Sequence, residues 1–255
     1  MGAQQLKQRA KQVTRRLIGE PYVGKRLKLR RVGPAMKALD LHPRRILDAG
    51  AEDATFVYWL ADRYPSADVL AVDIDAEAIA ACVTARPARY EGRVEFRVSY
   101  FADLEPESLD LVTAFDVFEH IDDDLDAARD LHRALVPGGY LLVHVPRDVW
   151  THRDGRQEHV PDDEAWRINP GHVRQGYSPE RMRELLETAG FEVLEQDTWL
   201  RRNAVVAHEV YRRLEHPAPL RLLSVPVTDV MSLLDRRRPA AEGNSVWTVA
   251  RKPSA

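Results

Sequence analysis

Short apolar segments and amphipathic helical segments alternate along most of this chain, and this alternation constrains its fold more than any other feature. The apolar segments predict seven strands, at residues 45–50, 68–73, 94–98, 109–115, 140–145, 191–198 and 245–250. Between them, side chains at three- and four-residue spacing predict helices at residues 55–64, 76–84, 123–135 and 178–189. Repeated strand–helix units of this length indicate a mainly parallel sheet with helices on both faces, which is the doubly wound α/β class.

Two long segments depart from this alternation. Residues 146–177 are rich in His, Arg, Asp, Pro and Trp, and a connection of this length is uncommon unless it has a function. Residues 200–243 contain an amphipathic helical stretch and lie between the last two strands. We expect both segments to form a substrate lid on a core domain of residues 45–255, which a basic helical segment of residues 1–44 precedes.

The N-terminal region differs in charge from the rest of the chain. Residues 1–45 contain 13 Lys and Arg against 2 Asp and Glu, whereas the remaining residues contain 24 against 38. Helices are predicted at residues 4–18 and 25–41, the second interrupted by Gly33 and Pro34. The basic segment either contacts an anionic partner, such as phosphate, nucleic acid or a lipid headgroup, or presents a solvated basic face while docked on the acidic core. Both interpretations stay open.

Composition excludes several classes of protein. No apolar run approaches the roughly 18 residues that a membrane-spanning helix needs, and the basic N-terminus lacks the apolar stretch of a signal peptide, so we expect a cytoplasmic protein. The single cysteine, Cys82, cannot form an internal disulfide. No cluster of Cys and His has the spacing of a zinc site, so no metal is predicted. The oligomeric state is not indicated.

Ligands of a doubly wound sheet bind beyond the carboxyl ends of its strands. This rule selects the loop of residues 48–53 after the first strand, and Asp73 at the end of the second. A carboxylate at Asp73 can accept hydrogen bonds from both ribose hydroxyls of a nucleoside, while Gly50 allows close approach of the backbone. Because Glu52 and Asp53 would repel a diphosphate, a cationic nucleoside fits this loop better than a dinucleotide does.

These segments resemble, in order, the motifs of the class I S-adenosylmethionine-dependent methyltransferases. The resemblance extends from Ile46 to Lys252 and rests on ILDAGAEDA, VLAVDIDAEAI, LDLVTAFDVFEHIDD, LVPGGYLLVHVP and GHVRQGYSPERMRELLETAGFEV. The last stretch is similar to one in the bacterial small-molecule and glycan branch. The resemblance implies a Rossmann-like sheet whose last strand is antiparallel, and S-adenosyl-L-methionine as the cofactor.

The resemblance also implies which residues contact the cofactor. These are Asp48, Ala49, Gly50, Ala51, Asp73, Ile74, Phe115 and Asp116. The backbone after the first strand would meet the amino-acid end, and Asp48 would orient that loop or reach the cofactor ammonium. Asp73 would hold the ribose, and Ile74 would pack on the adenine. Asp73 has a second interpretation as a helix N-cap, and Phe115 and Asp116 have one as strand-end packing and loop capping.

One part of the glycine-rich motif departs from the family pattern. The family usually places glycines where this chain has Glu52 and Ala54. We therefore expect a loop that is shaped differently or that binds the cofactor less tightly.

Histidines are the candidate bases, since methyl transfer needs one only where the nucleophile must lose a proton. His144 lies within the fifth strand, where alternation decides whether it faces the core or the ligand. His120 and His172 are further candidates, with a loop-stabilising hydrogen bond and a structural clamp as their respective alternatives. Contacts with the substrate are predicted for Trp150, His152, Arg174 and Tyr177. His172 and Arg174 share the clamp alternative, and Trp150 and Tyr177 have core filling under a lid as theirs.

The sequence thus predicts a methyltransferase that acts at oxygen on a small molecule, a sugar, or a lipid-linked or natural-product acceptor. One alternative is an RNA methyltransferase that uses the basic N-terminal arm. This is disfavoured by the acidic body and by the absence of a separate RNA-binding module. The other is a binding module that has lost its chemistry through Glu52 and Ala54.

Overall fold

The computed structural model describes residues 20, 22–159, 161–164, 171–214, 223–236 and 243–254. The helix predicted over residues 4–18 lies outside this range. The chain divides into two compact units, which we call the sheet unit (residues 42–149, 159–197 and 245–255) and the helical unit (residues 1–41, 150–158 and 198–244). Each unit is described by itself.

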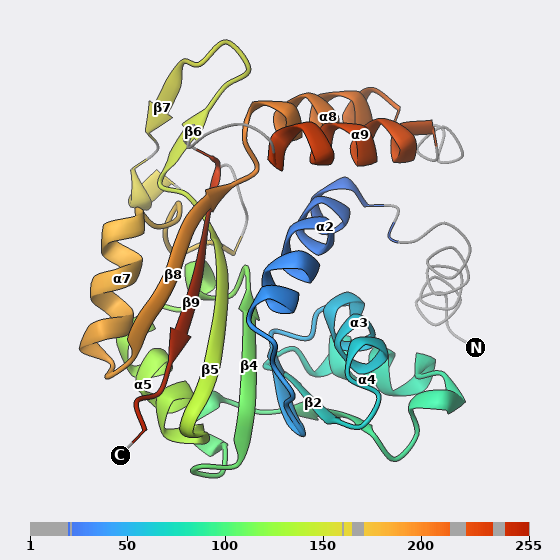
Figure 1. Cartoon of the computed structure of the whole chain (residues 1–255), viewed down its shortest axis with the longest axis vertical. Helices are drawn as coiled ribbons and strands as arrows, with labels where there is room; N and C mark the ends of the chain where they lie inside the picture. Colours follow the sequence, from blue (N-terminus) through green and yellow to red (C-terminus); the bar gives the residue numbers. More distant parts are fainter. Residues whose placement is uncertain are drawn as a thin grey trace. The chain divides into compact units, whose positions relative to one another are not determined.

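The sheet unit is built on the predicted seven-stranded sheet, in the order β3-β2-β1-β4-β5-β9-β8 (Figure 1). Its strands are β1 (Arg45–Ala49), β2 (Asp68–Asp73), β3 (Val94–Val98), β4 (Leu109–Phe115), β5 (Leu135–Pro146), β8 (Glu192–Trp199) and β9 (Ser245–Arg251). Strands β1 to β5 pair in parallel, whereas β9 is antiparallel to β5. The predicted Rossmann-like sheet with an antiparallel last strand is confirmed.

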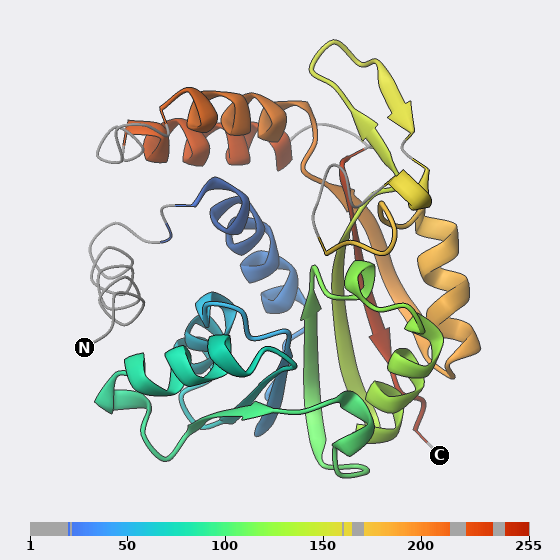
Figure 2. The ribbon, with the colours of Figure 1, turned by 180° about the vertical axis from the view of Figure 1, so that it is seen from behind.

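Helices cover both faces of this sheet (Figure 1, Figure 2). They are α3 (Thr55–Arg63), α4 (Ala76–Ala85), α5 (Asp124–Ala134) and α7 (Pro179–Thr188), with short 3₁₀ turns η1 (Ala88–Tyr90), η2 (Phe101–Asp103), η3 (Phe118–His120) and η4 (Asp162–Glu164). Side-chain oxygens of Asp75, Asp123 and Ser178 cap the first turns of α4, α5 and α7. These caps satisfy amide groups that a helix leaves without partners.

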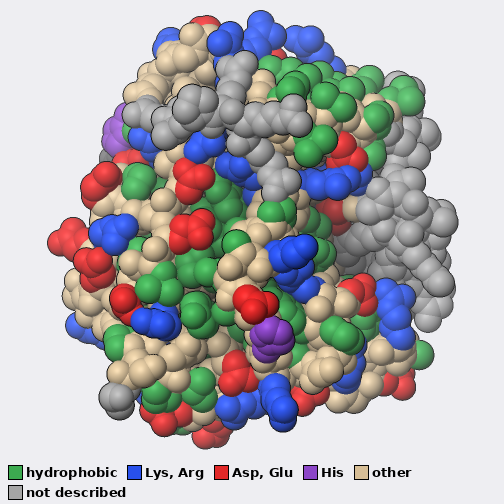
Figure 3. Space-filling model, in the orientation of Figure 1, with side chains coloured by type: hydrophobic (Ala, Val, Ile, Leu, Met, Phe, Trp, Pro, Cys, Tyr) green, Lys and Arg blue, Asp and Glu red, His purple; other side chains and the backbone are tan. Residues whose placement is uncertain are grey.

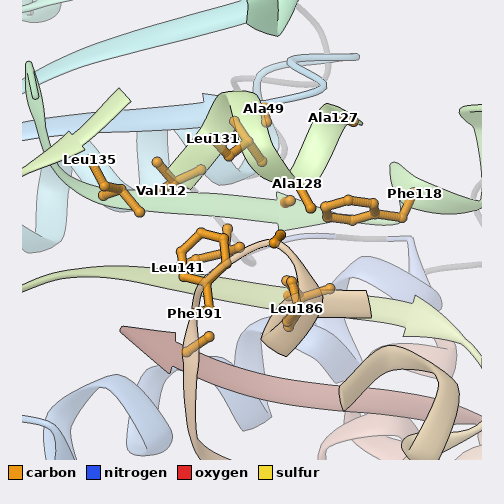
Figure 4. Close-up of a cluster of buried hydrophobic side chains, with 14 of the residues drawn as sticks. Ala49, Val112, Phe118, Ala127, Ala128, Leu131, Leu135, Leu141, Leu186 and Phe191 are labelled. Atoms are coloured by element: carbon orange, nitrogen blue, oxygen red, sulfur yellow. The ribbon is translucent and has the colours of Figure 1, made fainter. Parts of the chain in front are cut away.

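The main apolar core lies between the sheet and helices α5 and α7 (Figure 4). Alternate side chains of the central strands point into it, among them Val143 and Val145 of β5. Because successive side chains of a strand point to opposite faces, His144 belongs to the other face. On that face Phe115 contacts Phe56 of α3, with ring centroids 4.9 Å apart. Alternation therefore places His144 outside the α5–α7 core.

Two predicted element boundaries were wrong. Strand β5 begins at Leu135 rather than at residue 140, because Leu135 already pairs with Leu109 and the register then shifts before Leu111. Helix α2 (Val23–Ala38) continues through Pro34 instead of breaking there. A proline removes one backbone donor, which the rest of a 16-residue helix can tolerate at a cost of a few kcal/mol.

The helical unit contains α2, α8 (Arg202–Arg213) and α9 (Ser224–Arg236). A small core joins α2 to α8 through Val23, Leu27, Ala204, Ala207 and Tyr211. Two short strands, β6 (Val149–Thr151) and β7 (Gln157–His159), form a separate two-stranded sheet.

Charged side chains join α2 to α9. Both Arg26 and Arg30 donate to the carboxylate of Asp229, with the shortest nitrogen–oxygen distances at 2.7 and 2.8 Å. Helix α9 also exposes apolar side chains, including Val230 and Leu233, and hydrophobic atoms gather over it in Figure 3. None of the described helices is both long and apolar enough to cross a bilayer. The predicted lid role of segments 146–177 and 200–243 stays a prediction.

Candidate functional site

The turn after β1 brings its backbone close to the backbone of β2. Gly50 has a φ of +81°, and its amide donates to the carbonyl of Val72 at 2.9 Å. A β-carbon at this position would lie 2.7 Å from Cγ2 of Val117. Both the left-handed backbone and the lack of space require glycine. Ala51 donates to the same carbonyl at 3.0 Å, so the turn from Ala49 to Ala51 is fixed against β2.

Asp48 lies inside the sheet, near the end of β1 that leads into this turn. Its side chain is buried, and its Oδ1 accepts a hydrogen bond of 2.6 Å from the hydroxyl of Thr113. The two residues are direct neighbours in the pairing of β1 with β4. Both predicted roles of Asp48, orienting the loop and reaching a cofactor ammonium, stay predictions.

Asp73 connects the ends of β1 and β2. Its Oδ2 accepts from the amide of Glu52 at 3.1 Å and its Oδ1 from the amide of Asp75 at 3.0 Å. The N-cap of helix α4 is Asp75 rather than Asp73, which excludes the capping alternative. A carboxylate has about four lone-pair positions, so two remain after these contacts, as two ribose hydroxyls require.

The two positions at which this chain lacks the family glycines keep a left-handed backbone. Glu52 has a φ of 42° and Ala54 a φ of 59°. A side chain in this conformation costs roughly 1–2 kcal/mol, which glycine would not incur. The loop therefore has backbone angles suited to glycine without having the glycines. Beneath it lies the buried Cys82, whose Sγ is 3.5 Å from the carbonyl oxygen of Glu52.

Apolar side chains lie exposed beside Asp73. Ile74, which follows β2, is 68% exposed. Val98 pairs with Asp73 across β2 and β3, and Tyr100 lies two residues further along. Their exposed fractions are 51% and 68%. Ile74 was predicted, whereas Val98 and Tyr100 were missed, although their place at and just after the end of the third strand could have identified them. We call these three residues the apolar patch.

Strands β4 and β5 end with a paired carboxylate and imidazole. Phe115 and His144 are neighbours in the strand pairing, and Nδ1 of His144 lies 2.9 Å from Oδ1 of Asp116. The side chain of His144 is only 2% exposed, whereas that of Asp116 is 34% exposed. Asp116 is thus the member that can reach a ligand, and His144 lies behind it. Phe115 is buried against Phe56, as its packing alternative proposed.

The two remaining candidate bases lie next to each other. The rings of His120 and His172 are 4.6 Å apart between centroids and nearly perpendicular. Nδ1 of His120 lies 2.8 Å from the carbonyl oxygen of Gly171, which is the hydrogen bond that its alternative role predicted. Burial, and next the charge of His120, lower the pKa of His172 to about 4. His172 is therefore a neutral imidazole at physiological pH.

Arg174 and Tyr177 tie the segment that follows Gly171 to the turn after β4. The guanidinium of Arg174 donates to the carbonyl oxygens of Phe118, Ile121 and Asp122. The hydroxyl of Tyr177 donates to Asp124 at 2.7 Å, and burial together with this contact raises its pKa. The contacts of Arg174 are those of its clamp alternative, and Tyr177 is fully buried, as its core-filling alternative proposed. A direct substrate contact by either residue stays a prediction.

Trp150 and His152 belong to the helical unit. The indole of Trp150 is exposed, with an exposed fraction of 40%. Nε2 of His152 lies 2.8 Å from Oε2 of Glu158. Their predicted contacts with a substrate stay predictions.

Comparison with known proteins places this arrangement in context. The sequence model of a family described as "Methyltransferase domain" matches residues 13–196. A curated protein of Mycolicibacterium smegmatis, named "Probable S-adenosylmethionine-dependent methyltransferase", is 37% identical over 152 residues, which are 59% of this chain and 52% of that protein. A trans-aconitate 2-methyltransferase of Rhodopseudomonas palustris is 29% identical over 125 residues, or 49% of this chain and 47% of that one. Each match thus covers about half of the relative.

A solved structure shows the same fold. A SAM-dependent methyltransferase from Archaeoglobus fulgidus superimposes with a TM-score of 0.57 at 19% sequence identity. The match covers 93% of this chain and 97% of that one. At this level of identity the likeness concerns the fold alone.

Proposed function

The chain belongs to the methyltransferase domain family, and we propose that it transfers a methyl group from S-adenosyl-L-methionine to an oxygen atom of a small-molecule, sugar or glycan acceptor. The carboxylate of Asp73 carries the cofactor part of this proposal, since it stands at a strand end with lone pairs to spare. The name of the trans-aconitate methyltransferase, a relative that acts on a small molecule, supports the acceptor class.

The residues around Asp73 fit each part of the cofactor. The spare lone pairs of Asp73 suit two ribose hydroxyls. The apolar patch of Ile74, Val98 and Tyr100 offers exposed hydrophobic surface on which an adenine ring can pack. The turn at Gly50 keeps the backbone free of side chains at the end of β1.

When bound, S-adenosylmethionine supplies a methyl group that its positive sulfonium makes electrophilic. The task of the protein is then chiefly to hold two reactants in line, which can contribute about 7–11 kcal/mol. Negative charge at the strand ends helps to hold the cationic reactant. The carboxylate of Asp73 ends β2 and that of Asp116 follows β4, on the two sides of β1, and both favour a cationic ligand.

The pair formed by Asp116 and His144 supports oxygen as the acceptor atom. A hydroxyl nucleophile must lose a proton, and a positioned acceptor of that proton typically contributes 10²–10⁴-fold. Asp116 is exposed enough to receive the proton, while His144 fixes the orientation of its carboxylate from the buried side. We therefore assign proton acceptance to Asp116 and positioning to His144.

The cofactor site is tested by calorimetry with S-adenosylmethionine and S-adenosylhomocysteine. Asp73→Asn should weaken binding about tenfold, because it removes charge and one acceptor from a partly buried group. The matched control is Asp75→Asn, since asparagine also caps helices well, and it should bind as the natural protein does. Failure of the natural protein to bind at millimolar cofactor would favour the inactive binding module instead.

The acceptor is tested by incubating the protein and labelled cofactor with metabolite pools. Mass spectrometry should detect a product that is heavier by one methylene group. Asp116→Asn should abolish its formation, with a smaller loss of cofactor affinity than Asp73→Asn causes. His144→Gln should lower turnover and shift its pH profile, which a purely structural residue would not do. Methylation of RNA instead, with binding that weakens steeply with salt, would support the RNA alternative.

A further inference from the structure

Three metal-ligating side chains meet just beyond the Asp116–His144 pair. Glu119 and His120 belong to turn η3, and His172 lies on the segment that follows Gly171. One ligand atom from each of the three lies within 4.8 Å of the other two. Such a set could not be recognised from sequence spacing, because 52 positions separate His120 from His172.

The environment prepares these three groups for a cation. Glu119 is fully buried, and a carboxylate oxygen of it lies within 4.8 Å of a ring nitrogen of each histidine. The contact between Nδ1 of His120 and the carbonyl of Gly171 makes this nitrogen the N–H donor, so that Nε2 keeps its lone pair. Histidines that bind metals usually donate their other nitrogen to a carbonyl or carboxylate in this way.

The backbone that carries the three groups is held independently of them. The amide of Val173 donates to the carbonyl of Glu119 at 2.9 Å. Arg174 bonds the carbonyls on both sides of the turn, at Phe118 and Ile121. Gly171 has a φ of +92°, and a β-carbon there would lie 3.5 Å from the His120 ring. The two segments are thus fixed side by side before any ion binds.

We propose that Glu119, His120 and His172 form a binding site for one divalent transition-metal ion of the zinc class. Two imidazoles and one carboxylate are a donor set that suits this class, whereas Mg²⁺ and Ca²⁺ prefer oxygen ligands alone. Three protein ligands leave at least one coordination position for water or another oxygen ligand. Neither the site nor its test depends on the proposed methyl transfer.

The distances require at most a small closing movement on binding. Two atoms that each lie about 2.1 Å from one ion are at most about 4.2 Å apart, and the three ligand atoms already lie within 4.8 Å of one another. The ion would then join turn η3 to the segment around His172 and raise the melting temperature.

The test uses the full chain without an affinity tag, after treatment with a chelator. Calorimetric titration with ZnCl₂ should show one ion per chain. Titration with CoCl₂ should give visible absorption bands typical of nitrogen and oxygen ligands in a site of low coordination number. Thermal unfolding should shift upward with Zn²⁺. Glu119→Gln and His172→Gln should each weaken binding at least tenfold, since loss of outer partners alone costs 10–100-fold.

The matched control is His42→Gln, which removes an exposed histidine outside the cluster and should leave affinity and stoichiometry unchanged. Absence of binding by the natural protein would overturn the proposal, as would affinity that neither cluster variant changes. If Glu119→Gln does not fold, the half-buried His172→Gln and the cobalt spectrum of the natural protein decide the question. A defect in cofactor binding would not affect any of these readouts, so the two proposals can fail separately.

Discussion

The sheet unit and the helical unit use their charged side chains differently. In the sheet unit Asp73 and Arg174 bond mainly to backbone amides and carbonyls, and so fix the course of loops. In the helical unit Arg26 and Arg30 bond to the side chain of Asp229. Backbone partners cannot titrate or be exchanged, whereas a carboxylate can. We conclude that Arg174 holds its loop through carbonyl partners that do not titrate, while the joint between α2 and α9 depends on one carboxylate.

The largest expected effect is in the apolar core of the sheet unit. Because the charged side chains compared above in this unit mainly fix loops, its apolar core should supply most of its stability. Leu141 is fully buried in this core. Leu141→Ala should lower the free energy of unfolding by about 2–5 kcal/mol, because it removes apolar contacts and leaves a cavity. Urea denaturation followed by circular dichroism measures this change. Leu194→Ala, at a position on β8 that is 42% exposed, is the control and should change the value by less than about 1 kcal/mol.

A smaller effect is expected at Asp229, the carboxylate that joins α2 to α9 in the helical unit. Asp229→Asn should cost about 1–2 kcal/mol, since the side chain of Arg26 is only 9% exposed and would lose a charged partner. Thermal and urea unfolding of the variant would show this loss. Asp126→Asn removes a carboxylate of a surface ion pair with Arg129 in the sheet unit and should cost less than about 1 kcal/mol. Equal costs at both positions would contradict the comparison.

The carboxylate of Asp229 should also make the free energy of unfolding depend on pH. Burial alone would raise the pKa of Asp229, but hydrogen bonds from Arg26 and Arg30 outweigh it and lower the pKa below its usual value. The contribution of this group is therefore complete above the unfolded pKa of about 3.9, and it is lost as pH falls through the lower folded pKa. Unfolding measured from pH 7 to pH 3 should show this loss, which Asp229→Asn should reduce.

The smallest effect is expected in the loop after β1, and its sign is opposite. Glu52→Gly should raise the free energy of unfolding by up to about 1 kcal/mol, because glycine adopts the φ of 42° without steric cost. Calorimetric unfolding would detect the gain. Glu95→Gly, on the extended backbone of β3, serves as the control and should destabilise. A loss of stability in Glu52→Gly would show that the strain is compensated by contacts of the Glu52 side chain.

The strands were predictable because their burial on both faces leaves a continuous apolar signal. The strand at residues 68–73 was predicted with both of its ends. The start of β5 was not, since Pro137, Gly138 and Gly139 give a turn signal. In the sheet, Gly138 and Gly139 exchange backbone hydrogen bonds with Lys252. A local turn signal cannot show that a distant strand supplies partners.

The site was predictable where it depends on a single strand end and unpredictable where it depends on contacts across the fold. Gly50 and Asp73 follow from the rule that ligands bind at the carboxyl ends of strands. The pairing of Asp116 with His144 needs the register of β4 and β5. The neighbourhood of Glu119 and His172 needs the loop that Arg174 fixes. Neither register nor loop closure is encoded in local periodicity.

Cys82 is an intrinsic reporter of the loop after β1, beneath which it lies. It is the only cysteine of the chain, and its thiol is buried against the carbonyl of Glu52. A thiol reagent can reach it only when helix α4 or the loop opens locally, and so its rate of modification measures that opening. A ligand that closes the loop would slow the reaction, which makes occupancy observable without a label, an engineered residue or a known acceptor.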